Sequence, residues 1–126
     1  NCINETISWY TENLFCTVGR HDPKWVDFNF FGHQISAHLS TNHNRSISNS
    51  VDEHKVPIRH FGIILTQNQW QKLADNLKEN NIEFVIEPYT RFKGKLGEQS
   101  TMFIKDPSGN ALEFKAFKND TMIFEN

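Results

Sequence analysis

The sequence lacks the long apolar runs and the basic clusters that mark several classes of protein. No stretch approaches the ~20 consecutive apolar residues that a membrane-spanning helix needs, so we expect no membrane partner. The net charge is only −2 and the basic residues are scattered, which argues against a nucleic-acid partner. No signal-peptide pattern opens the chain, so the expected location is the cytoplasm.

Cysteine is scarce, with only Cys2 and Cys16 present. The segment between them is predicted to be helical, and a helix of that length separates its ends by ~20 Å. A disulfide needs Cα atoms within ~7 Å of each other. We therefore expect two free thiols, which suits a reducing compartment.

Phenylalanine, in contrast, is abundant, with eleven copies. Many stand in short runs typical of strands, which favours a β-rich core. A chain of 126 residues suits one domain, or two small modules that share a core.

Apolar residues spaced three and four apart predict helices over residues 3–15 and 67–80. Alternating or β-rich apolar runs predict strands over residues 24–31, 34–40, 58–65, 82–87, 99–105 and 111–117. The two halves thus repeat an order of elements, except that the first half lacks the strand that opens the second. We predict one domain over residues 1–126, with a first module at about 1–40, a polar linker at 41–57, a second module at about 58–117 and a tail at 118–126.

His60 and Glu113 are the first candidates for chemistry, because they fall in the first and last predicted strands of the second half. An imidazole and a carboxylate from neighbouring strands can hold a divalent cation and leave positions open for water or substrate. A structural interpretation stands beside this one: His60 would be a hydrogen-bonded core histidine, and Glu113 would pair with Lys105 or Lys115. His38, near the end of the strand at 34–40, is a weaker candidate. Surface roles are expected for the other four histidines, His21, His33, His43 and His54.

Two segments of the second half resemble the vicinal oxygen chelate superfamily, which includes glyoxalases, bleomycin-resistance proteins and extradiol dioxygenases. Residues 56–63, V-P-I-R-H-F-G-I, resemble the start of its metal-binding module. Residues 103–113, F-I-K-D-P-S-G-N-A-L-E, resemble its closing hairpin, where a D-P-x-G-N turn precedes a ligand Glu. Residues 25–39 and 84–95 are similar to the small predicted dioxygenase-like proteins of bacteria. The resemblance spans nearly the whole chain.

The resemblance implies an α+β fold in which two βαβββ modules form a curved mixed sheet around a cup-shaped site, with the first strand of module 1 missing. It also implies a divalent metal ion (Fe, Mn, Zn or Ni) held by two His and one Glu. His60 and Glu113 match two of these ligands, and the other His would lie in the missing strand. Aligning Gly32 with Gly109 places Ser36 opposite Glu113, and His38 shares that face two residues later, near the position of a fourth ligand.

A segment at residues 87–94 is expected to form a loop over this site. Its polar side chains Tyr89, Arg91 and Lys93 are the candidates for binding substrate, with Arg91 holding an anionic group. A solvated basic loop is the alternative interpretation. Glu98 is a candidate general base, although a surface role is preferred for it.

The leading functional hypothesis is a metal-dependent enzyme, dioxygenase-like or lyase/isomerase-like, that chelates vicinal oxygens of a small oxygenated or aromatic substrate. Extradiol enzymes have a Tyr where Phe103 stands and a His shortly before it, and residues 94–101 contain no His. The acid–base residues of ring cleavage are therefore not found. Two alternatives stay open: a non-catalytic drug-binding protein of the bleomycin-resistance type, and a metal-dependent thiol transferase that confers antibiotic resistance. By resemblance, a homodimer is expected.

Overall fold

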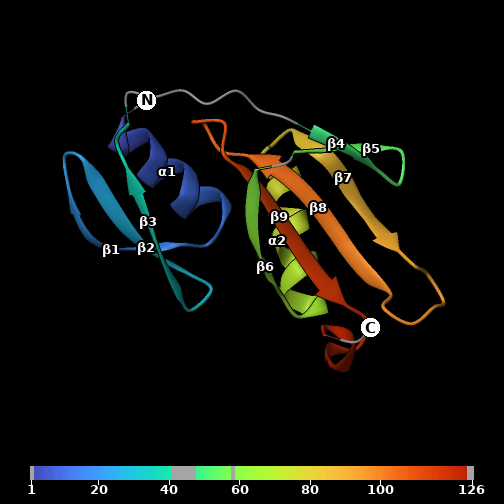
Figure 1. Ribbon diagram of the computed structural model, residues 1–126. Coiled ribbons are helices and arrows are strands. Elements are labelled where there is room, and N and C mark those ends of the chain that lie inside the picture. The colour runs from blue at the N-terminus through green and yellow to red at the C-terminus, as the bar shows by residue number, and fades with distance from the viewer. Residues whose placement is uncertain (1, 41–47, 58, 125–126) are drawn as a thin grey trace. The chain divides into compact units, whose positions relative to one another are not determined.

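The computed structural model describes residues 2–40, 48–57 and 59–124. The chain divides into two compact units, residues 1–45 with 106–109 and residues 46–105 with 110–126. Each unit contains a helix and a β-sheet (Figure 1), which confirms the predicted α+β class. No helix in these described ranges is long and apolar enough to cross a membrane.

The first unit consists of one helix and a three-stranded antiparallel sheet of order β1-β2-β3. Its elements are α1 (Ile3–Asn13), β1 (Thr17–Asp22), β2 (Trp25–Phe30) and β3 (His33–His38). The apolar face of the helix packs on the sheet, where the Tyr10 ring stacks on Phe28 with centroids 5.0 Å apart. A two-residue turn joins β2 and β3, and its residues Phe31 and Gly32 both have positive φ, as a type I′ hairpin turn requires.

The main sheet of the second unit and its helix follow the predicted βαβββ order. Its elements are β6 (His60–Ile64), α2 (Gln67–Glu79), β7 (Phe84–Arg91), β8 (Gln99–Lys105) and β9 (Ala111–Phe117). The sheet is mixed and has the order β6-β9-β8-β7, in which β6 pairs parallel with β9 and the other pairs are antiparallel.

Helix α2 lies against one face of this sheet (Figure 1). Thr66 caps its first turn in a reciprocal capping box with Gln69. The predicted apolar face is buried, and Trp70 Nε1 donates to the carbonyl oxygen of Phe114, 3.0 Å away. Because side chains alternate along a strand, Phe114 faces the helix while Glu113 and its neighbours on the same side of β9 face away from it.

The second part of the predicted linker is ordered as a hairpin of β4 (Ser48–Val51) and β5 (His54–Pro57). The polar sequence of this segment is typical of a linker. The segment can still form a hairpin, because the hairpin is stabilised by backbone pairing rather than by an alternating apolar face. Strand β1 was also not predicted as a separate strand, since every residue in it is exposed. The predicted tail contains a short 3₁₀ helix, η1 (Asp120–Met122). The remainder of the linker, residues 41–47 with His43, lies outside the described residues.

Both cysteines are free, as predicted. Cys2 caps the start of α1, where its sulfur accepts a hydrogen bond from the Glu5 backbone N–H. Cys16 is buried, and burial raises the pKa of its thiol to about 11.

Candidate functional site

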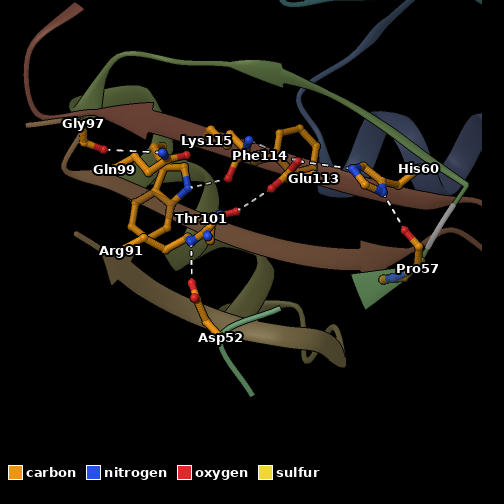
Figure 2. Close-up of polar contacts among 11 residues, drawn as sticks. Asp52, Pro57, His60, Arg91, Gly97, Gln99, Thr101, Glu113, Phe114 and Lys115 are labelled. Carbon is orange, nitrogen blue, oxygen red and sulfur yellow. Dashed lines mark hydrogen bonds and ion pairs between the residues drawn. The ribbon is translucent and has the colours of Figure 1, made fainter. Parts of the chain in front are cut away.

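The imidazole of His60 and the carboxylate of Glu113 meet on the face of the second sheet that is opposite α2. Strands β6 and β9 are direct neighbours, so Nε2 of His60 lies 3.4 Å from Oε1 of Glu113 (Figure 2). The two side chains are 30% and 15% exposed. Glu113 is therefore largely buried, whereas His60 lies open to solvent at the start of β6, so a small molecule can reach the pair.

The orientation of the His60 ring is determined on its other side. Nδ1 lies 2.6 Å from the carbonyl oxygen of Pro57 (Figure 2), and a carbonyl can only accept. Nδ1 therefore carries a proton, and in the neutral ring the lone pair of Nε2 faces Glu113. The edge of Phe103 packs against the imidazole with ring centroids 5.1 Å apart, which limits rotation of the ring.

Glu113 has two further partners. The hydroxyl of Thr101 donates to Oε2 over 3.0 Å (Figure 2). The ammonium group of Lys115 lies 3.7 Å from Oε1. The predicted structural pairing with Lys115 is thus present together with the His60 contact, and a largely buried carboxylate is supplied with the partners that its charge requires.

His38 lies in the other unit, at the end of β3, where it pairs with Trp25 and is exposed. Among residues 2–40, 48–57 and 59–124, no three His, Cys, Asp or Glu side chains gather in a way that could hold a metal ion. His60 and Glu113 therefore form a pair of potential ligands, and the metal role of all three residues stays a prediction.

Arg91 is the last residue of β7 rather than part of a loop, so the predicted loop over residues 87–94 begins only at Phe92. The strand is longer than predicted because its antiparallel pairing with β8 continues as far as Arg91 and Gln99. Nε of Arg91 donates to Oδ2 of Asp52 over 2.5 Å (Figure 2). Lys93 is exposed in the loop that follows.

Tyr89 donates its hydroxyl to the same oxygen of Asp52, 3.3 Å away. Burial raises the pKa of Tyr89; Arg91 opposes this rise, whereas the charges of Asp52 and Glu113 add to it. Tyr89 is therefore a hydrogen-bond donor at neutral pH. Tyr89 also lies near the His60–Glu113 pair, because it pairs with Thr101 on β8, which donates to Glu113.

Glu98 has a local structural role. Its Oε1 accepts a hydrogen bond from the backbone N–H of Gly94 over 2.7 Å, which closes the turn between β7 and β8. This contact agrees with the preferred surface interpretation of Glu98.

Three polar residues with buried or paired side chains were missed by the sequence analysis. Asp27 alternates with apolar residues in the sequence, yet it is buried and accepts from the Ser36 hydroxyl over 2.5 Å. Asp52 fell in the predicted linker. Gln99 is buried, and its Oε1 has no hydrogen-bond partner among the described residues. Asp27 lies in a strand of alternating polar and apolar residues, and Gln99 opens a polar stretch of β8, so the sequence carries no signal that distinguishes them from solvent-facing residues.

An open groove of about 740 Å³ lies elsewhere on the second unit. Its lining residues include Thr66, Lys95, Phe117, Lys118 and Met122, but none of His60, Glu113 and Arg91. We place the candidate site at the His60–Glu113 pair, because the convergent polar groups lie there.

A comparison with protein families matches residues 1–114 to the Glyoxalase/Bleomycin resistance protein/Dioxygenase superfamily. The chain belongs to this superfamily. A solved member from Alicyclobacillus acidocaldarius, a glyoxalase/bleomycin resistance protein/dioxygenase, is 33% identical with a TM-score of 0.80. That similarity covers 96% of this chain and 87% of the other.

Two more distant structures show the same fold. The fosfomycin resistance protein FosX from Listeria monocytogenes is 12% identical, with a TM-score of 0.68 and coverage of 95% of this chain and 87% of that one. A putative glyoxalase family protein from Bacillus anthracis is 16% identical, with a TM-score of 0.64 and coverage of 91% and 84%. No curated protein matches the chain.

Superfamily membership gives a reason to test whether His60 and Glu113 suit a divalent metal. A metal-ligating His donates its other ring N–H to a carbonyl or carboxylate, and His60 does this with Pro57. A ligating carboxylate is itself hydrogen-bonded, and Glu113 accepts from Thr101. Imidazole nitrogen and carboxylate oxygen are donors for Fe, Mn, Zn and Ni. The two residues therefore fit part of a metal site.

Proposed function

We propose that this superfamily member is a metal-dependent enzyme that acts on a small oxygenated or aromatic molecule through chelation of vicinal oxygens. His60 and Glu113 would be two of the metal ligands. The observation that supports this proposal is the 3.4 Å distance between His60 Nε2 and Glu113 Oε1. Each side chain is also oriented by a hydrogen bond of its own, His60 by the Pro57 carbonyl and Glu113 by the Thr101 hydroxyl.

When bound, a divalent Fe, Mn, Zn or Ni ion would act as a Lewis acid on the oxygens of the substrate. The residues of the chain have the remaining roles. Pro57 keeps the His60 ring in one tautomer, and Thr101 orients the carboxylate of Glu113. His38 is the candidate for a further ligand.

Tyr89, Arg91 and Lys93 are the candidates for binding the substrate. Tyr89 and Arg91 present a phenol and a guanidinium donor close together at the end of β7, and both groups suit an oxygen-rich ligand. Lys93 follows them in the exposed loop and would add positive charge. We further propose a homodimer located in the cytoplasm, with the dimer testable by light scattering of the purified protein.

A second candidate function is metal-free binding of an aromatic drug, as in proteins of the bleomycin-resistance type. It is favoured by the direct contact of His60 with Glu113, which forms an ion pair without a metal when Nε2 also carries a proton. It is also favoured by Phe103, which offers an aromatic edge beside His60 and cannot donate a proton. A thiol transferase that inactivates an antibiotic is a narrower form of the first proposal.

Metal content tests the proposal. Full-length protein would be purified without chelators or a His-tag, and bound transition metals would be quantified in the wild type, His60→Ala and Glu113→Ala. Glu87→Ala is the matched control, because Glu87 is an exposed carboxylate on β7. His38→Ala tests the further ligand.

We expect near-stoichiometric metal in the wild type and Glu87→Ala, and its loss in His60→Ala and Glu113→Ala. Catechols, α-keto aldehydes and thiol transfer to antibiotics would then be screened. If reconstitution loads no metal into any of the proteins, the enzyme proposal fails. Drug binding that persists in Glu113→Ala would then support the second candidate.

A further inference from the structure

The β4–β5 hairpin lies against β7 and reaches the two donors that are candidates for binding substrate. The ring of His54 packs on Tyr89 with centroids 4.7 Å apart. At the tip of the hairpin, Asp52 Oδ2 accepts from Arg91 Nε over 2.5 Å and from the Tyr89 hydroxyl over 3.3 Å (Figure 2 shows the Arg91 contact). A carboxylate of the chain itself therefore occupies both donors.

The backbone at this tip is unfavourable for the residues that form it. Asp52 and Glu53 have φ of 48° and 66°, so two successive residues other than glycine adopt the left-handed conformation. Two-residue hairpin turns of this kind accept Asp at the first position but favour Gly at the second, so Glu53 carries most of this cost. The contact of Asp52 with Arg91 offsets this cost only while the hairpin is closed.

The contact is also open to competition. The side chain of Asp52 is 43% exposed, whereas that of Arg91 is only 21% exposed. An exposed ion pair contributes little net free energy, because water solvates both groups well when they separate. A dissolved anion that reaches Arg91 therefore competes with a weakly held intramolecular carboxylate.

We infer that Asp52 stands in for the oxyanion of a ligand. Ligands of this site carry a carboxylate or phosphonate group, take the place of Asp52 on Arg91 and Tyr89, and displace the tip of the hairpin. This inference rests on the proposed function only in assigning the other end of the ligand to His60 and Glu113.

The register of the sheet gives the size of such a ligand. Tyr89 on β7 pairs with Thr101 on β8, and Thr101 donates to Glu113 on β9. Tyr89 is thus two strands across and two residues along from Glu113, which at the usual strand spacing and rise corresponds to about 12 Å. A ligand that spans both positions is a small molecule with an anionic group at one end and vicinal oxygens at the other.

The side-chain Nε–Hε signal of Arg91 in ¹⁵N NMR spectra tests the inference, because this group bonds Asp52 directly. Metal-free protein would be titrated in chelator with methylphosphonate and, separately, with acetate. We expect Asp52→Asn to bind the better anion about tenfold more tightly than the wild type, the factor for a contact closed in nine of ten molecules. Glu53→Gln, at the neighbouring turn position, is expected to bind like the wild type. Arg91→Gln assigns the signal and is expected to abolish binding.

Equal affinities in Asp52→Asn and the wild type, or binding that leaves the Arg91 signal unmoved, would overturn the inference. The ratio of the dissociation constants of methylphosphonate and acetate shows whether the site prefers a tetrahedral or a planar oxyanion. Because the titration is done without metal, its outcome is independent of the metal analysis. If the protein binds the anion but loads no metal, the inference stands and the enzyme proposal fails. If the protein loads metal but binds no anion at Arg91, only the inference is overturned.

Discussion

The hydroxyl of Tyr10 donates a hydrogen bond to Oδ2 of Asp106, 2.8 Å away and 96 residues later in the chain. Both residues are buried, at 4% and 7% exposure. The other oxygen of Asp106 accepts from the backbone N–H of Ser108, so the carboxylate also organises the turn between β8 and β9. The D-P-x-G-N motif thus contributes a buried carboxylate to the first unit in addition to a turn.

Replacing Tyr10 with Phe removes the donor and keeps the ring stacked on Phe28. A hydrogen bond to a buried charged group contributes about 1.5 to 3 kcal/mol, so we expect the free energy of unfolding to fall by this amount in urea denaturation. Tyr89→Phe removes a partly exposed hydroxyl and should cost less than about 1 kcal/mol. Equal losses in the two variants would contradict the assigned role of the Tyr10 bond.

Gly62 is required where β6 pairs with β9. A Cβ added there would lie 1.7 Å from the backbone oxygen of Glu113, and backbone cannot give way as a flexible side chain can. We expect Gly62→Ala to destabilise the protein by about 3 kcal/mol or more, seen as a large drop in the melting temperature. Gly19→Ala is the control, because its Cβ would come no closer than 3.4 Å to Asp27. A melting temperature for Gly62→Ala close to that of the control would show that the strands do not pair in this register.

Thr101→Val tests the positioning of the Glu113 carboxylate. Valine keeps the volume of the buried side chain and removes the hydroxyl that donates to Oε2. If Glu113 is a metal ligand as proposed, loss of this supporting bond should lower metal affinity by about 10- to 100-fold, which competition with a coloured chelator would measure. Thr90→Val, an exposed position on β7, should leave the affinity unchanged. A normal affinity in Thr101→Val would assign the hydroxyl to packing alone.

Alkaline pH is predicted to destabilise the fold through Cys16. Its thiol has an ordinary pKa of 9.0, and burial raises the pKa to about 11. Between pH 9 and 11 the unfolded chain loses this proton first, so the free energy of unfolding falls as pH rises. The contribution is complete below pH 9, and its loss by pH 11 amounts to on the order of 2 kcal/mol.

Urea denaturation at pH 8, 9 and 10 measures this effect. Tyr10, whose pKa is also raised by burial, acts in the same direction at still higher pH. Cys16→Ala retains the Tyr10 contribution and removes that of the thiol, so its stability should fall less steeply with pH. Parallel profiles for Cys16→Ala and the wild type would contradict the prediction.

The sequence predicted the elements whose side chains separate into a buried and an exposed face. Helix α2 is an example, since Trp70, Leu73 and Leu77 follow the helical spacing and are all buried. Strand β1 and the β4–β5 hairpin carry no such pattern. They are held by backbone pairing with neighbours, which leaves no period in the sequence.

In the candidate site, too, the residues that stand in local sequence motifs were predicted, whereas a pairing between distant segments was not. His60 and Glu113 were recognised because each lies in a recognisable strand motif, and the structure places them on adjacent strands. The bond between Asp52 and Arg91 joins residues 39 positions apart. Nothing near either residue indicates the other, so this pair emerged only from the fold.

Strand β9 follows β6, β7 and β8 in the chain, yet it lies between β6 and β8 in the sheet. The sheet of the second unit therefore cannot be completed until residues 111–117 leave the ribosome. Before that point β6 has no partner in this sheet, and β8 is paired along only one edge. Insertion of β9 completes the backbone pairing and carries Glu113 to His60 in the same event. A nascent or prematurely terminated chain that lacks β9 keeps only the β7–β8 pairing of this sheet and lacks Glu113, so the candidate site cannot form before β9 is inserted.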